Sequence, residues 1–177
     1  MDKSLSKTKV YIDGSNVFYT QKKLGWSFDW VKFRKIIEND HDVVEWKYYV
    51  GLKDDDEKMS SYLRYLSAIG FTTITKPLKK IRIGNNDVRS QINNSFIYKA
   101  NFDVEITADI LLDKSNIREI ILFSGDSDFE YLVRRLKDAG VKTCIFSSRK
   151  TISWELKLVA GGVVYFESMR ALIERAK

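Results

Sequence analysis

Two acidic motifs, each placed directly after an apolar run of β-forming residues, contain the side chains best suited to chemistry. They are residues 13–16 (Asp-Gly-Ser-Asn) and residues 124–128 (Ser-Gly-Asp-Ser-Asp). If both runs are strands of one parallel sheet, their carboxyl ends lie at the same edge, where open α/β sheets bind ligands. Asp13, Asp126 and Asp128 would then share one crevice, and their mutual repulsion favours a bound divalent cation. The pattern therefore predicts a metal site suited to phosphodiester cleavage.

Each motif also has a simpler explanation, because Asp and Ser are favoured caps at helix starts. Asp13 or Ser15 can cap a helix that begins near Asn16. Ser127 and Asp128 likewise precede a second run with helical periodicity. Capping does not require a full carboxylate at all three aspartate positions, so the combination of motifs favours function over capping.

A third acidic segment begins at Asp103, at the amino end of a predicted helix that runs toward the strand before Asp126. A carboxylate is favourable there through the helix dipole alone, so Asp103 has a structural explanation as well. Asp109 lies six residues further, rotated by roughly 120° on an ideal helix. We therefore expect Asp109 to have a supporting or structural role.

The composition of the chain limits which kind of protein it can be. The chain has 177 residues, 44% hydrophobic and 13% aromatic, which predicts a compact globule rather than a disordered chain. No apolar stretch approaches the ~20 residues that span a bilayer, and residues 1–9 lack an apolar signal core. The single cysteine, Cys144, fits a reducing cytosol, so we expect a cytoplasmic protein without a membrane partner. The net charge is +6, and because several acids are assigned to the cleft, the remaining surface suits a polyanionic partner.

Strands alternate with helices along the whole chain, which predicts βαβ units and a three-layer α/β/α sandwich around a mainly parallel sheet. We expect one domain over residues 9–177, preceded by a flexible tail at residues 1–8, with an inserted β-hairpin at about residues 78–94. The expected strands are 9–12, 43–50, 71–75, 119–123, 141–146 and 163–166. The expected helices are 16–24, 28–39, one between Asp54 and Gly70, 102–112, 129–139, 151–159 and 168–176.

These motifs give the chain a specific resemblance. It resembles the NYN domain proteins of the LabA-like (DUF88) group, a branch of the PIN-like nuclease superfamily. The similar segments are residues 11–16, Lys99 with residues 102–104 and Asp109, residues 122–129, residues 132–135 with Gly140, and residues 153–156. Of these, the Ser-Gly-Asp-Ser-Asp-Phe element at residues 124–129 is the most distinctive.

The resemblance implies a Rossmann-like (PIN-like) sandwich and a metal-dependent ribonuclease that cuts endonucleolytically. It implies that a cluster of aspartates binds Mg²⁺ or Mn²⁺. In the family pattern the ligands fall on Asp13, Asp103 and Asp126, with Asp128 beside them. Asn16 and Ser124 are expected to orient ligands or water, and Ser127 and Asp109 to support the site.

The predicted hairpin alternates basic and apolar residues, a pattern that suits contact with an RNA backbone. The expected RNA-binding cations are Lys79, Lys80, Arg82 and Arg89, with Lys99 at the scissile phosphate. The alternative is a solvated sheet edge that its lysines protect from aggregation. The RNA could be single-stranded or structured, and an apolar helix face would also allow a homodimer.

Several features separate the competing functions. The lone histidine, His41, lies in a polar loop far from the acidic motifs, which argues against catalysis by paired histidines. A haloacid-dehalogenase-like phosphatase would need a second aspartate where Ser15 stands. A non-cleaving RNA-binding module remains the alternative from another class. The four tryptophans could stack on bases, although their spacing favours core packing; they are Trp26, Trp30, Trp46 and Trp154.

Overall fold

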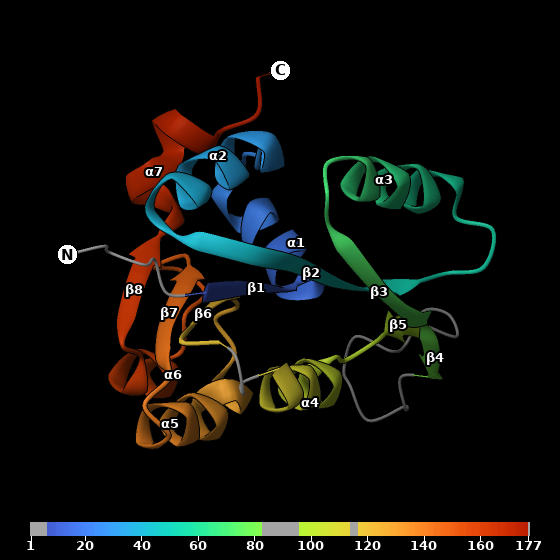
Figure 1. Cartoon of the computed structure of the whole chain (residues 1–177). Coiled ribbons are helices and arrows are strands. Elements are labelled where there is room, and N and C mark those ends of the chain that lie inside the picture. Colours follow the sequence, from blue (N-terminus) through green and yellow to red (C-terminus); the bar gives the residue numbers. More distant parts are fainter. Residues whose placement is uncertain (1–6, 83–95, 114–116, 177) are drawn as a thin grey trace.

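The apolar runs assemble into one six-stranded, entirely parallel sheet (Figure 1). The structure, a computed structural model, describes residues 7–82, 96–113 and 117–176. The strands are β1 (Lys7–Asp13), β2 (Asp42–Leu52), β3 (Thr72–Pro77), β6 (Glu119–Phe123), β7 (Lys142–Ser147) and β8 (Gly162–Tyr165). Their order is β3-β2-β1-β6-β7-β8, so the direction of strand succession reverses between β1 and β6. A reversal of this kind opens a crevice at the carboxyl ends of the two central strands.

Helices cover both faces of the sheet and bury its two apolar surfaces. On one face lie α1 (Gly14–Leu24), α2 (Trp30–Asp40), α3 (Glu57–Ala68) and α7 (Phe166–Ile173). On the other lie α4 (Asp103–Asp113), α5 (Glu130–Asp138) and α6 (Trp154–Val159), together with the short 3-10 helix η2 (Ser127–Phe129). The predicted α/β sandwich is thereby confirmed. In the described part of the chain, no helix combines the length and the apolar character needed to cross a bilayer.

The core beneath α2 is unusually aromatic. The Trp30 and Phe33 rings lie 5.8 Å and 5.4 Å from the ring of Phe123 on the central strand β6. Trp26 and Trp46 are also buried, as their spacing predicts. Trp154 is the exception: its side chain is 65% exposed at the start of α6, so the expectation of core packing is wrong for this residue.

Most predicted elements agree with the structure to within a few residues, and the differences have local causes. The sheet begins at Lys7, two residues before the predicted strand. The sixth helix starts at Trp154 and not at residue 151, because the Ser153 hydroxyl oxygen accepts a hydrogen bond from Leu156 N–H and caps it there. The last strand ends at Tyr165, and buried Phe166 belongs to the helix that follows.

Between β3 and α4 the chain forms a separate antiparallel ribbon. Its two strands are β4 (Lys79–Arg82) and β5 (Phe96–Lys99). Its first strand matches the start of the predicted hairpin. The rest of the predicted hairpin, residues 83–94, lies outside the described residues. The described returning strand is β5, which leads directly into α4.

Candidate functional site

Asp13 is the last residue of β1 and lies at the centre of the site. Its Oδ1 accepts hydrogen bonds from Asn16 N–H (3.1 Å) and from the Ser15 hydroxyl (2.9 Å), so it also caps α1. The Ser124 hydroxyl, at the end of β6, donates to Asp13 Oδ2 (3.3 Å). Because residue 13 is only 6% exposed, these bonds fix its carboxylate in one orientation. Asp13 therefore acts as a helix cap and also joins the two central strands.

The second motif closes onto the first. Asn16 Oδ1 accepts a hydrogen bond from Gly125 N–H (3.1 Å), across 109 positions of the chain. Asp126 N–H donates to the Ser124 hydroxyl oxygen (3.2 Å), and Asp126 Oδ1 accepts from Asp128 N–H (3.1 Å). The two acidic motifs therefore meet at the sheet edge, as their positions after parallel strands predict.

Two glycines permit this approach. A Cβ atom on Gly125 would lie 2.4 Å from the carbonyl oxygen of Thr151 and 2.8 Å from Ser147 Oγ. On Gly14 it would lie 2.5 Å from the carbonyl oxygen of Tyr49. Neither position therefore accepts a side chain without a shift of neighbouring backbone.

Gly125→Ala will displace the loop that carries Asp126. We expect a loss of about 1–2 kcal/mol in the free energy of unfolding, because overpacking against backbone cannot be relieved by a side-chain rotation. Urea denaturation measures this loss. Gly162→Ala is the matched control, since a Cβ there meets only Cys144 Sγ, at an ordinary 3.8 Å. Equal stability of the two variants would contradict the steric argument.

The electrostatics of Asp13 reflect its burial and its acidic neighbour. Burial raises the pKa of Asp13 above its ordinary value. The hydrogen bonds from Asn16, Ser15 and Ser124 oppose this rise, and the negative charge of Asp126 adds to it. A buried carboxylate that is ionised beside another acid is an unfavourable arrangement in the absence of a cation.

Asp103, the first residue of α4, belongs to the same electrostatic group. Burial raises its pKa, a hydrogen bond with Asn101 lowers it, and the charges of the other three aspartates raise it further. These three are Asp126, Asp13 and Asp128, in that order of effect. Among the described residues, no Lys, Arg or His forms an ion pair with any of the four. In the same described ranges, no three Asp, Glu, His or Cys side chains gather closely enough to hold one ion between them.

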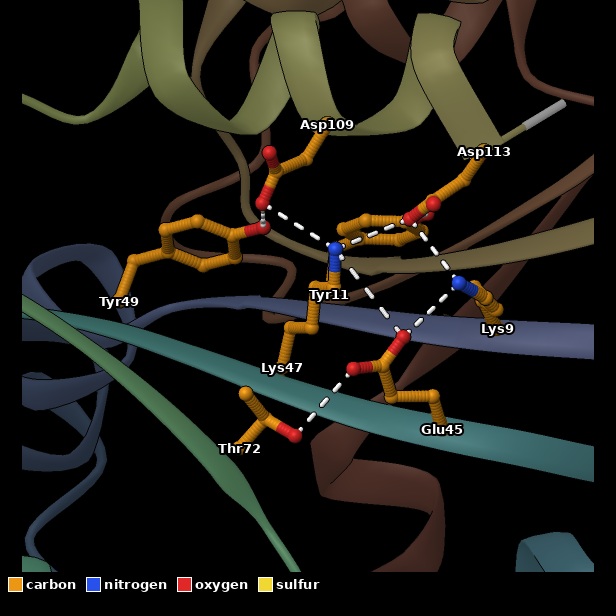
Figure 2. A network of polar contacts seen from close by, with 8 residues as sticks. All are labelled: Lys9, Tyr11, Glu45, Lys47, Tyr49, Thr72, Asp109 and Asp113. Atoms are coloured by element: carbon orange, nitrogen blue, oxygen red, sulfur yellow. Dashed lines mark hydrogen bonds and ion pairs between the residues drawn. The ribbon is translucent and has the colours of Figure 1, made fainter.

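Asp109 points into a polar network between α4 and the sheet (Figure 2). Its Oδ2 accepts hydrogen bonds from the Tyr49 hydroxyl (2.6 Å) and from Lys47 Nζ (3.2 Å). One turn later, Asp113 Oδ2 lies 2.9 Å from Lys47 Nζ and 3.1 Å from Lys9 Nζ, and accepts from the Tyr11 hydroxyl at 2.8 Å. These contacts bind the second half of α4 to β1 and β2.

Sequence reasoning missed this network. Its strand residues are Lys9 and Tyr11 on β1 and Lys47 and Tyr49 on β2. A signal was present, because each pair is spaced by two and so lies on one strand face, while Asp109 and Asp113 are spaced by four on one helix face. The pairing of those faces required the sheet order.

The remaining site candidates lie as follows. Ser127 opens η2 and is exposed. Lys79, Lys80 and Lys99 are exposed on the β4–β5 ribbon, Arg82 ends β4, and Arg89 lies outside the described residues. His41 Nδ1 lies 2.7 Å from Glu119 Oε2, at the amino end of β6 and thus at the opposite sheet edge from Asp13.

The model of the NYN domain family matches residues 7–167. The chain belongs to the NYN domain family. This NYN chain is 30% identical over 174 residues to the low amplitude and bright protein LabA of Synechococcus elongatus, covering 97% of this chain and 90% of that protein. A crystal structure of a protein of unknown function from Vibrio parahaemolyticus has the same fold, with a TM-score of 0.75 at 24% identity over 93% of this chain and 95% of that one. The NYN family is part of the PIN-like nuclease superfamily.

Proposed function

We propose that this NYN protein is a metal-dependent ribonuclease that cleaves RNA internally at the aspartate cluster. The observation that carries the proposal is the hydrogen-bonded junction of the two acidic motifs at the strand-order reversal, where Ser124 contacts both Asp13 and Asp126. The charges of Asp126, Asp13 and Asp128 also raise the pKa of Asp103, which places this fourth acid near them. Ion pairs do not neutralise these carboxylates within the described residues. Membership of a nuclease superfamily supports the same reaction class.

The residues present fit a hard divalent cation. The donors are carboxylate and hydroxyl oxygens, which suit Mg²⁺ or Mn²⁺ better than zinc. Asp13, Asp103 and Asp126 would hold the ion, with Asp128 beside them, after moving closer together than they lie in the described residues. When bound, such an ion supplies an activated water and neutralises charge on the scissile phosphate.

The neighbouring polar residues position this cluster. The Ser124 hydroxyl donates to Asp13 and accepts from Asp126 N–H, so it sets the spacing of these two aspartates. Asn16 is held through its side-chain oxygen by Gly125 N–H, which leaves its amide nitrogen to donate to a phosphate oxygen. Lys99 on β5 supplies a cation toward the substrate, four positions before Asp103. We place the reaction in the cytoplasm, on single-stranded or structured RNA.

One observation favours a second candidate, a regulatory module that binds RNA without cutting it. In the described ranges no three metal-ligating side chains gather around one point, whereas an efficient nuclease needs such a centre when it is loaded. The geometry does not support the phosphatase alternative. That mechanism needs a second aspartate at position 15, where this chain has Ser15, whose hydroxyl donates to Asp13.

The decisive experiment is cleavage of a 5′-labelled single-stranded RNA in Mn²⁺, in Mg²⁺ and in EDTA. We expect internal cuts with either metal, none in EDTA, and a loss of roughly 10²–10³-fold for Asp126→Asn. Asp138→Asn, an exposed aspartate on α5, is the matched control and should cleave as wild type does. Binding without cleavage would favour the regulatory module, and equal activity of Asp126→Asn would place the reaction elsewhere. Phosphate release from an aryl phosphate would indicate the phosphatase.

A further inference from the structure

The β4–β5 ribbon exposes apolar side chains that folding alone leaves uncovered. Ile81, Phe96, Ile97 and Tyr98 are each 41–46% exposed. An isolated two-stranded ribbon is marginally stable in water, and large exposed apolar groups on it mark a contact surface. These side chains therefore form a candidate contact surface.

The strand register divides the ribbon into two chemically different faces. Lys80 pairs with Tyr98, and Arg82 pairs with Phe96, so the backbone places these four positions on one face. The alternate positions form the other face, with Ile81 opposite Ile97 and Lys79 opposite Lys99. The first face thus combines aromatic with basic positions, and the second combines isoleucine with lysine.

On the aromatic face, cations already lie against the rings. Lys80 Nζ is 3.9 Å from the centre of the Phe96 ring. Lys53 Nζ, from the loop after β2, is 5.0 Å from the centre of the Tyr98 ring. A flat aromatic ring can stack on a base, while the cation in contact with that ring binds the neighbouring phosphate.

We propose that this face binds single-stranded RNA, with Phe96 and Tyr98 stacking on bases and Lys80 and Lys53 contacting phosphates. The inference rests on the proposed RNA substrate. Residues two apart on a strand are separated by about 6.6 Å, twice the ~3.4 Å rise of a duplex strand. The unstacked bases of a single strand can match this spacing, and those of a duplex cannot.

The charge of the ribbon selects a polyanion over a second copy of the chain. On the aromatic face, the Lys80 and Lys53 ammonium groups both lie against the rings. Two copies packed through this face would bring these like charges together, whereas a phosphate backbone is attracted to them.

The ribbon also lies close to the aspartate cluster along the chain. Phe96–Lys99 is followed by α4 from Asp103, so at most ~14 Å of extended chain separates their ends. Lys76 on β3 holds this connection, because its Nζ bonds the Asn101 carbonyl oxygen and lies 2.6 Å from Glu105 Oε1. RNA on the ribbon would therefore extend toward Asp103.

The test measures binding of a fluorescein-labelled 12-nucleotide single-stranded RNA by fluorescence anisotropy, in EDTA so that cleavage plays no part. Phe96→Leu and Tyr98→Leu keep apolar bulk and remove the flat ring. We expect each to weaken binding by roughly 5- to 100-fold. Tyr98→Phe keeps the ring and should bind as wild type does. Ile97→Ala, on the opposite face of the same strand, is the matched control and should change affinity less than twofold.

Unchanged affinity in both leucine variants would overturn the inference, as would equal losses in Ile97→Ala. Binding of a matched duplex as tight as that of the single strand would also overturn it. A dimer in sedimentation that Phe96→Leu dissolves, without an effect on RNA binding, would assign the face to a second copy and refute the proposal. These results are independent of cleavage. Aromatic-dependent binding in EDTA, together with no cutting in Mn²⁺ or Mg²⁺, would refute the nuclease proposal and support this one.

Discussion

Asp13→Asn will abolish RNA cleavage and at the same time make the metal-free protein more stable. The activity loss follows from the central place of this carboxylate, and we expect at least roughly 10²–10³-fold. The stability gain follows from the burial and the Asp126 charge that raise the pKa of Asp13. Asparagine keeps a side-chain oxygen for Asn16 N–H and Ser15 but carries no charge. Cleavage assays and thermal melts in EDTA measure the two effects.

The pH dependence of this stability difference has a definite sign. The pKa of Asp13 in the folded state lies above its ordinary value of 3.8. The folded protein therefore binds this proton more tightly, and the associated stability is lost as pH rises through the folded pKa. The advantage of Asp13→Asn should be full at pH 7 and shrink as pH falls through that pKa toward 3.8.

Asp113→Asn is the matched control, because its shift has the opposite sign. Burial raises the pKa of Asp113, but hydrogen bonds from Lys47, Tyr11 and Lys9 together lower it below its ordinary value. This substitution should destabilise the protein at pH 7. Mn²⁺ should raise the melting temperature of wild type and of Asp113→Asn, and much less that of Asp13→Asn. A destabilised Asp13→Asn protein that still responds to Mn²⁺ would refute this account of the cluster.

Lys47→Met will destabilise the protein by about 2–3 kcal/mol at pH 7. The Lys47 ammonium lies between the Asp109 and Asp113 carboxylates, with its side chain only 13% exposed (Figure 2). Its removal leaves two partly buried carboxylates facing each other, and breaking such a pair costs about 3–5 kcal/mol when it is fully buried. Because both acids are partly exposed, we expect a loss just below that range. Urea denaturation measures the loss.

Lys47→Met should also disturb the aspartate cluster, because Asp103 lies in the first turn of α4. We expect weaker Mn²⁺ binding in Lys47→Met, read from the smaller shift in melting temperature. Lys76→Met is the matched control: Lys76 also contacts α4, through Glu105, but both side chains are about one-third or more exposed. Lys76→Met should lower the free energy of unfolding by no more than about 1 kcal/mol. Equal costs for the two lysines would show that the network does not anchor the helix.

Local sequence patterns were sufficient for the elements and for the position of each acid. The strand at residues 119–123 was predicted with its observed bounds, because a continuous β-branched and aromatic run between turn residues admits few alternatives. The positions of Asp13 and Asp126 were predictable because the carboxyl ends of parallel strands lie at one sheet edge. The capping explanation also proved true for Asp13, which shows that a cap and a site residue can be the same side chain.

Other features depended on which element covers which. Periodicity shows that a helix or strand has an apolar or polar face, and it does not show the partner of that face. For this reason the exposure of Trp154, the contact of Lys47 with Asp109 and Asp113, and the described returning strand at Phe96–Lys99 could not be predicted.

The acidic motifs, the alternation of strands and helices, and the family follow from residue types and their spacing alone. The strand order that joins Asp13 to Ser124, the approach of Asn16 to Gly125, and the coupling of Asp103 to the other aspartates follow only from the packed fold. The difference lies in how far apart along the sequence the interacting residues are. Secondary structure follows from interactions a few residues apart, whereas the site is built from contacts between segments about a hundred residues apart, and only packing of the whole sheet specifies those.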